Sequence, residues 1–138
     1  MIALDTNIIV RFLARDDAAS YAIVETLLAT CEVSVSPTVI LETEWVLRSS
    51  YRLAKGEIWA ALSQMLTLPN FFVQEREAVI QALKWSHLGL DLADALHLAL
   101  AGHAQAFATF DSDLIQKAAP INPPIQVRNP QQLLPVKP

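Results

Sequence analysis

The sequence predicts an α/β fold, a single domain in which a parallel sheet of four to five strands is sandwiched by helices. Short apolar segments alternate with stretches of helical composition along the whole chain, which is typical of a parallel sheet connected by helices. Apolar residues predominate in the short segments, as in Ile2-Ala-Leu4 and Phe71-Phe-Val73, which is typical of strands in a sheet covered by helices. At 138 residues the chain is long enough to bury one core.

Local signals place each element in order. Pro37 suits the first turn of a helix, Pro69-Asn70 is expected to end one, and Asp111 to cap another. The segments predicted as strands are residues 2–4, 33–35, 71–73, 106–110 and 125–127. Helices are predicted at residues 8–14, 18–30, 37–51, 55–68, 75–87, 91–104 and directly after Asp111.

The C-terminal part of the chain differs in composition from the rest. Six of the eight prolines lie from Pro120 onward, which predicts an irregular strap along the surface. We therefore expect residues 1–128 to form the domain and residues 129–138 to be a proline-rich tail.

Composition excludes several classes of protein. No apolar run reaches the roughly 18 to 20 residues that a membrane span needs. The N-terminal residues show no signal peptide, and one cysteine, Cys31, excludes an intrachain disulfide framework. We expect a soluble cytoplasmic protein with no membrane partner. The three glycines form neither a dinucleotide-binding fingerprint nor a P-loop.

The net charge of −4 argues against a protein that grips nucleic acid by bulk electrostatic attraction alone. It leaves open a nucleic-acid enzyme that works through bound cations, because carboxylates build the sites that hold them. Half of the basic residues fall in two helical segments, where they form either a phosphate-contacting rim or scattered solubilising charge. These residues are Arg11, Arg15, Arg48, Arg52 and Lys55.

Two acids, Asp5 and Asp111, directly follow predicted strands. Ligands of parallel α/β sheets bind beyond the carboxyl ends of the strands, so chemistry is expected there. Both residues are also good helix caps, and capping alone explains either of them equally well.

Glu42 lies in "TVILETEWVL", where its helical face continues through Trp45 and Val46. This face is largely apolar, and a lone carboxylate on it would be costly. Glu44 instead pairs with Arg48 at i, i+4, which indicates a solvated surface pair.

Asp94 stands in the apolar run "DLADALHLALA". A capping arrangement with Asp91 as the N-cap and Asp94 at the third helical position explains it structurally. If the first and fourth strands are adjacent, however, Asp94 can meet Asp5, Glu42 and Asp111 in one cleft. Gathered carboxylates raise one another's pKa, and a divalent cation with oxygen ligands, Mg²⁺ or Mn²⁺, relieves the repulsion.

Histidines and tryptophans carry weaker signals. The histidines show no zinc-ligand spacing with the cysteine, although His97 lies close to Asp94. The tryptophans fit core or interface positions better than base-stacking platforms.

At these acids the sequence resembles the PIN-domain ribonucleases, in particular the VapC-type toxins of bacterial toxin–antitoxin pairs. The matching motifs are "LDTNIIVRFL", "LETEWVL", "LADALHLALA" and "TFDSDL", in family order from Met1 to about the fifth strand. The resemblance implies an acidic quartet of Asp5, Glu42, Asp94 and Asp111.

The same resemblance implies that Asp113 is a possible auxiliary metal ligand and that Thr6 and Asn7 line the site. Arg11, from the basic group, is the candidate for substrate contact. The family further implies Mg²⁺ or Mn²⁺ as cofactor, RNA as substrate, a homodimer, and a VapB-like antitoxin whose tail occupies the cleft.

The predicted reaction is metal-assisted hydrolysis of RNA phosphodiester bonds. Asp5, Asp94 and Asp111 would hold the metal, and Glu42 would orient or deprotonate the attacking water. An aspartate-nucleophile phosphatase is a weaker alternative, because that chemistry needs an acid at the position of Asn7. A catalytically inactive PIN-like binding module is the alternative from another class.

Overall fold

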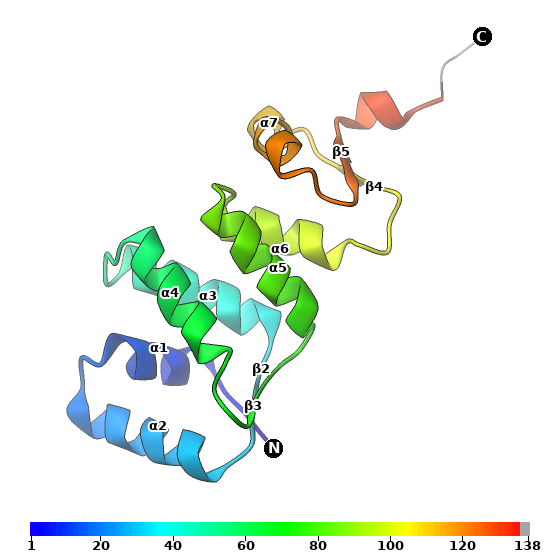
Figure 1. Cartoon of the computed structure of the whole chain (residues 1–138). Helices are drawn as coiled ribbons and strands as arrows, with labels where there is room; N and C mark the ends of the chain where they lie inside the picture. The colour runs from blue at the N-terminus through cyan, green and yellow to red at the C-terminus, as the bar shows by residue number, and fades with distance from the viewer. Residues whose placement is uncertain (136–138) are drawn as a thin grey trace. The chain divides into compact units, whose positions relative to one another are not determined.

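The structure, a computed structural model, describes residues 1–135 and has the predicted α/β class (Figure 1). Every strand pair in these residues is parallel. The helices are α1 (Thr6–Ala14), α2 (Ala18–Thr30), α3 (Pro37–Ser49), α4 (Lys55–Met65), α5 (Arg76–His87), α6 (Leu92–Leu100), α7 (Ser112–Ile121) and the 3₁₀ helix η1 (Pro130–Leu133). The strands are β1 (Ile2–Ala3), β2 (Val33–Val35), β3 (Phe71–Val73), β4 (Ala106–Ala108) and β5 (Gln126–Arg128).

The five strands form two parallel sheets rather than one. In residues 1–135 the order is β1-β2-β3 in the first sheet and β4-β5 in the second. The pairing of the first and fourth strands, on which the predicted cleft depended, is not among these pairings. Each strand has only two or three residues, and such short apolar segments carry little information about which strand they will join.

The chain divides into two compact units, residues 1–80 and the residues from 81 onward, and the division falls within α5. The proposed boundary between a domain ending at residue 128 and a tail from 129 stays a prediction. Every helix in residues 1–135 is too short or too polar to cross a lipid bilayer.

In the first unit, α1 packs against both α2 and α3 (Figure 1). The start of α3 follows from its sequence: the Ser36 hydroxyl accepts from the Val39 N–H at 3.3 Å, and Pro37 occupies the first turn. Ile40, Thr43 and Leu47 of this helix are fully or almost fully buried. Their i, i+3, i+7 spacing defines the face that α3 turns to the core, which leaves the opposite face for other roles.

In the second unit, α6 buries the apolar side chains of its run, including Ala95 and Leu98. Trp85 is also buried, as its helical position suggested, whereas Trp45 in the first unit is 55% exposed.

The proline-rich segment is more regular than predicted. It begins inside α7, where Pro120 is the penultimate residue, and continues through β5 into η1. A capping box at Asn129 starts η1, because the Asn129 and Gln132 side chains each bond the other's backbone. The expectation of an irregular strap was therefore wrong for the residues up to 135, and residues 136–138 lie outside the described part.

Candidate functional site

Asp5 lies at the carboxyl edge of the first sheet, as predicted. Ala3 of β1 pairs with Ser34 of β2, so Asp5 and Ser36 follow the paired residues at the same edge. Asp5 caps α1, with its Oδ1 accepting from the Thr6 N–H at 2.7 Å. The capping and functional interpretations of Asp5 are thus compatible, because the capped helix start is also the edge at which ligands of such sheets bind.

A pocket of about 420 Å³ lies between α1 and α3. Helical periodicity explains which residues line the pocket. Residues on one face of α1 lie opposite residues of α3 that are spaced four positions apart. The pocket is lined by Asp5, Thr6, Asn7, Val10, Arg11, Glu42, Val46, Ser50 and Tyr51. The structure therefore brings together two of the four predicted acids and all three predicted substrate-binding residues.

The environments of the two acids on α3 are the reverse of those expected. Glu42 is exposed at the pocket, whereas the Glu44 side chain is only 14% exposed. The predicted pair of Glu44 with Arg48 is confirmed, with 2.8 Å between Glu44 Oε1 and Arg48 Nε. Of the two acids on this helix, however, Glu44 is less exposed than Glu42. The helical stripe of Glu42 borders an open pocket instead of the core, so its carboxylate keeps access to water and to a ligand.

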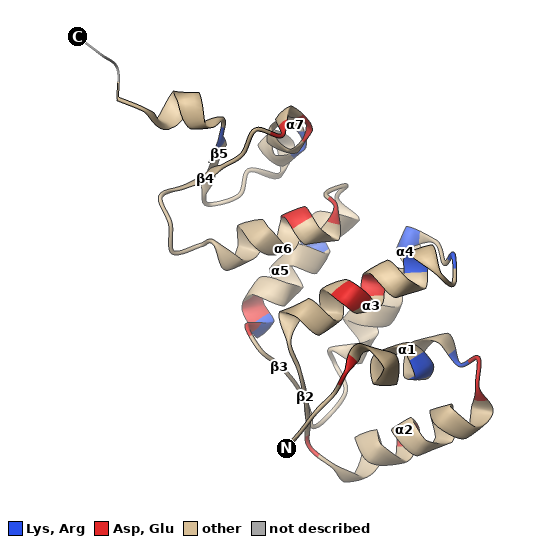
Figure 2. Cartoon of the chain, turned by 180° about the vertical axis from the view of Figure 1, so that it is seen from behind, with Lys and Arg blue, Asp and Glu red and all other residues tan. Residues whose placement is uncertain are grey.

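The pocket has side chains of opposite charge at the two ends of α1. Asp5 stands at the N-terminus of the helix and Arg11 in its last turn, each at the end where the helix dipole favours its charge. Figure 2 shows acidic residues at the start of α1 and on α3, with a basic residue farther along α1. Such a pocket offers a negative end and a positive end to one ligand.

In the second unit, the charges of Asp91 and Asp111 act on Asp94. Asp91 caps α6 by accepting from the Ala93 and Asp94 N–H groups at 3.1 and 3.4 Å, as the capping interpretation predicted. Burial raises the pKa of Asp94 above its ordinary value, and the charges of Asp91 and Asp111 raise it further. A half-buried acid held next to two other acids is well suited to bind a cation.

Asp111 caps α7. Its Oδ1 accepts from the N–H groups of Asp113 and Leu114 at 3.0 and 3.1 Å, and its own N–H donates to the Thr109 hydroxyl at 3.0 Å. Asp113 is exposed and forms an i, i+4 ion pair with Lys117 at 3.1 Å. Its role as an auxiliary metal ligand stays a prediction.

Asp94→Asn is expected to stabilise the metal-free protein at pH 7 by about 1 to 4 °C in Tm. A raised pKa means that the folded state disfavours the ionised carboxylate, so wild-type stability falls as pH rises past the ordinary aspartate pKa. The helix dipole favours the charge at this position by only about 0.3–1 kcal/mol, and the raised pKa shows that burial and repulsion outweigh it. Thermal unfolding in EDTA at pH 7 and pH 4 checks this, since the difference should be smaller at the lower pH, where more of the carboxyl group is protonated in both states.

Asp111→Ala is expected to cost about 1 kcal/mol of stability, and Asp111→Asn almost nothing, because asparagine caps a helix as well as aspartate does. Urea denaturation of both variants measures the difference. Equal loss in both would mean that the charge of Asp111, rather than its capping oxygen, supports the fold.

The donor chemistry of these acids fits a hard divalent cation. Asp5 and Glu42 in one unit, and Asp94 and Asp111 in the other, supply the carboxylate oxygens that Mg²⁺ and Mn²⁺ prefer. Within residues 1–135, however, no group of three or more His, Cys, Asp or Glu side chains is arranged to hold a metal ion. The predicted gathering of all four acids around an ion therefore stays a prediction.

The sequence did not indicate a functional role for Tyr51, which lines the pocket, or for Asp16, which contacts Tyr51. The Tyr51 hydroxyl donates to Asp16 at 2.9 Å across 35 positions of the chain. No local pattern signals a contact of that separation. Tyr51 does directly follow Ser50, the last residue of the Glu42–Val46–Ser50 stripe, and that spacing could have marked this region as part of the wall.

The PIN domain model matches residues 2–120 of the chain. The match covers most of the 138 residues, and the chain belongs to the PIN domain family. No curated protein matches the chain. The family assignment made from the four motifs is confirmed, and the narrower assignment to VapC-type toxins stays a prediction.

Proposed function

We propose that this protein is a metal-dependent endoribonuclease that hydrolyses RNA phosphodiester bonds. The observation that carries the proposal is the pocket between α1 and α3, where a PIN-family chain places Asp5 and Glu42 together with Thr6, Asn7 and Arg11. The influence of Asp111 on Asp94 in the second unit supports it independently.

The residues take the following roles in the proposal. Asp5, Asp94 and Asp111 hold Mg²⁺ or Mn²⁺, with Asp113 as an auxiliary ligand. When bound, such an ion supplies a water of lowered pKa and neutralises charge on the phosphate.

Glu42 accepts the proton of the attacking water, which suits an exposed carboxylate in an open pocket. Arg11 binds a phosphate of the RNA, while Thr6 and Asn7 contact it from the wall. The water oxygen bonds to phosphorus as the P–O bond to the 3′ oxygen breaks, and the departing oxygen takes a proton from solvent. The products carry 5′-phosphate and 3′-hydroxyl ends.

The biological setting proposed is the toxin of a toxin–antitoxin pair in the cytoplasm. The support is the run of motifs shared with VapC-type toxins. On this proposal the protein forms a homodimer and binds a small VapB-like antitoxin that closes the acidic site.

The test is incubation of purified protein with mixed cellular RNA in Mg²⁺, Mn²⁺ or EDTA, followed by end-labelling of the products. Cleavage that requires the metal and leaves 5′-phosphate ends is expected, and Asp5→Asn and Asp94→Asn should abolish it. Absence of cleavage under every metal would favour an inactive binding module. Release of inorganic phosphate from monoesters would favour the phosphatase, which Asn7 at the pocket argues against.

A further inference from the structure

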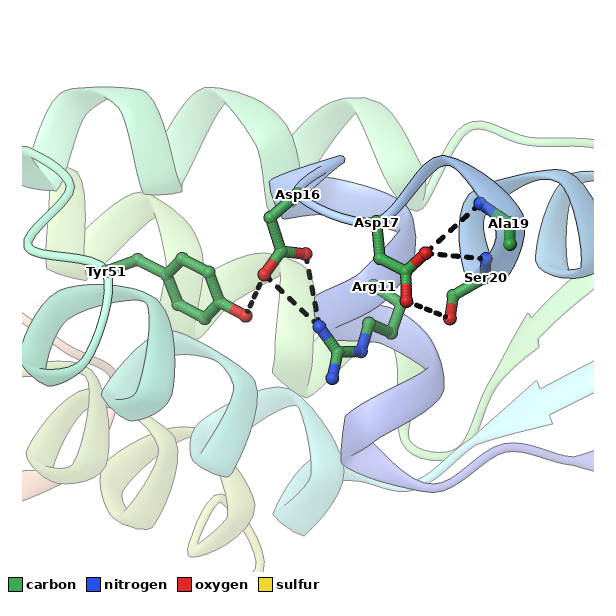
Figure 3. Close-up of polar contacts among 6 residues, drawn as sticks. All are labelled: Arg11, Asp16, Asp17, Ala19, Ser20 and Tyr51. Carbon is green, nitrogen blue, oxygen red and sulfur yellow. Dashed lines mark hydrogen bonds and ion pairs between the residues drawn. The ribbon is translucent and has the colours of Figure 1, made fainter.

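Asp16 links two residues of the pocket wall (Figure 3). Its carboxylate receives the Tyr51 hydroxyl at 2.9 Å and the Arg11 Nη1 at 3.2 and 3.3 Å. Asp16 itself lies in the connection between α1 and α2, while Tyr51 follows the end of α3. The three side chains thus join two loops at the basic end of the pocket.

The pairing leaves part of the Arg11 guanidinium available. Only Nη1 contacts Asp16, and no other hydrogen bond or ion pair of this guanidinium is found in residues 1–135. The Arg11 side chain is 44% exposed. A guanidinium can bind a phosphate with two parallel N–H groups, and one held through Nη1 still presents Nε and Nη2.

Stability does not explain this arrangement. Exposed ion pairs contribute little to folding, and both Arg11 and Asp16 are exposed. The network instead fixes the direction of the Arg11 side chain, because Asp16 binds the guanidinium and is itself bound by Tyr51. The hydrogen bond from Tyr51 is the main cause of the lowered pKa of Asp16. The same bond raises the pKa of Tyr51, and the opposite directions of the two shifts are those expected of a tyrosine hydroxyl that donates to a carboxylate.

We propose that Asp16 and Tyr51 are positioning residues that hold the Arg11 guanidinium at the pocket for contact with a backbone phosphate of RNA. The inference rests on the proposed function and adds two residues to it. Tyr51 acts here through Asp16 and Arg11, and does not itself touch the nucleic acid.

The competing role for Tyr51 is direct contact with RNA, by stacking on a base or by bonding a phosphate. The two roles differ in whether Tyr51 matters when Arg11 is absent. A double-mutant cycle between these positions therefore separates them.

Tyr51→Phe removes only the hydroxyl and Asp16→Asn removes only the charge. Each is expected to raise the KM for a short single-stranded RNA roughly three- to tenfold and to leave kcat within about twofold, because binding rather than chemistry is affected. Arg11→Gln should raise KM by at least as much. In the Arg11→Gln protein, adding Tyr51→Phe should change KM by less than about 1.5-fold. Tyr21→Phe is the matched control, since Tyr21 packs its ring on Phe12 away from the pocket lining.

An equal rise in KM from Tyr51→Phe with and without Arg11 would overturn the proposal in favour of direct contact. So would a fall in kcat with KM unchanged.

A second measurement is independent of catalysis. The chain has two tyrosines, so in the Tyr21→Phe protein ultraviolet titration reports Tyr51 alone. Asp16→Asn should lower the pKa of Tyr51, and no change would show that the network is absent in solution. If the wild type cuts no RNA while the titration shows the network, both the proposed function and the proposed role of Arg11 are excluded. The network then has a structural role only.

Discussion

Asp5→Asn is expected to reduce metal-dependent RNA cleavage by about a hundredfold or more while leaving the fold intact. The substitution removes the carboxylate charge with which Asp5 would hold a metal ion. It keeps the side-chain oxygen that accepts from the Thr6 N–H, and asparagine is as good a helix cap as aspartate. Loss of activity therefore cannot be ascribed to loss of the start of α1.

The measurement is kcat/KM on RNA with Mn²⁺, with circular dichroism and Tm as checks on folding. Asp17→Asn is the matched control, because Asp17 caps α2 through the Ala19 and Ser20 N–H groups and does not line the pocket. It should keep activity within about threefold. Equal activity of Asp5→Asn and wild type would assign Asp5 to capping alone.

Leu47→Ala is expected to destabilise the protein by about 2 to 5 kcal/mol. Leu47 has no exposed surface and lies on the core face of α3, the helix that also carries Glu42. Removing its side chain leaves a cavity that neighbours fill only partly. A loss of this size is a large share of the roughly 5–15 kcal/mol that stabilises an ordinary domain.

Urea denaturation of the metal-free protein measures the loss. Leu88→Ala is the matched control, the same substitution at a side chain 67% exposed, and should change stability by less than about 0.5 kcal/mol. A cost below about 1 kcal/mol at Leu47 would mean that the core around α3 collapses readily onto the missing group.

Local sequence signals predicted the elements well. The bounds of α2, β2 and β3 are those expected from residues 18–30, 33–35 and 71–73. An acid or a serine stands at the start of α1, α2, α3, α6 and α7, where its side-chain oxygen satisfies unpaired N–H groups. This signal acts within four residues. Helix ends were less accurate, since α6 stops at Leu100 rather than near residue 104.

Features that depend on distant partners were not predicted. Nothing in the composition of β4 distinguishes pairing with β5 from pairing with β1. For that reason the sequence did not predict that the parallel strands of residues 1–135 form two sheets. The face of α3 that carries Glu42 was predicted to be largely apolar because it includes Trp45. The Trp45 side chain is, however, largely exposed. The contact of Tyr51 with Asp16 joins two loops that only the fold brings together.

The site was predicted in part. Strand ends located Asp5, the resemblance selected Thr6, Asn7 and Glu42, and the grouping of basic residues indicated Arg11. All of these residues line one pocket. In the second unit the charge of Asp111 contributes to the raised pKa of Asp94, and the assignment of both residues to the site stays a prediction. Spacing alone could not decide whether all four acids bind one ion, since that depends on distances between elements far apart in the chain.

The length of α1 has a consequence for the substrate. Asp5 and Arg11 are six residues apart, about 9 Å along the axis of an α-helix, and the Arg11 guanidinium is held toward Asp16, beyond the helix end. Under the proposed function, the phosphate that is cut and the phosphate that is gripped are then different ones. A dinucleotide has one internucleotide phosphate and cannot occupy both ends of the pocket. The separation of Asp5 and Arg11 along α1 would then determine the shortest RNA that binds well. Comparing KM for RNAs of two to six nucleotides measures that length.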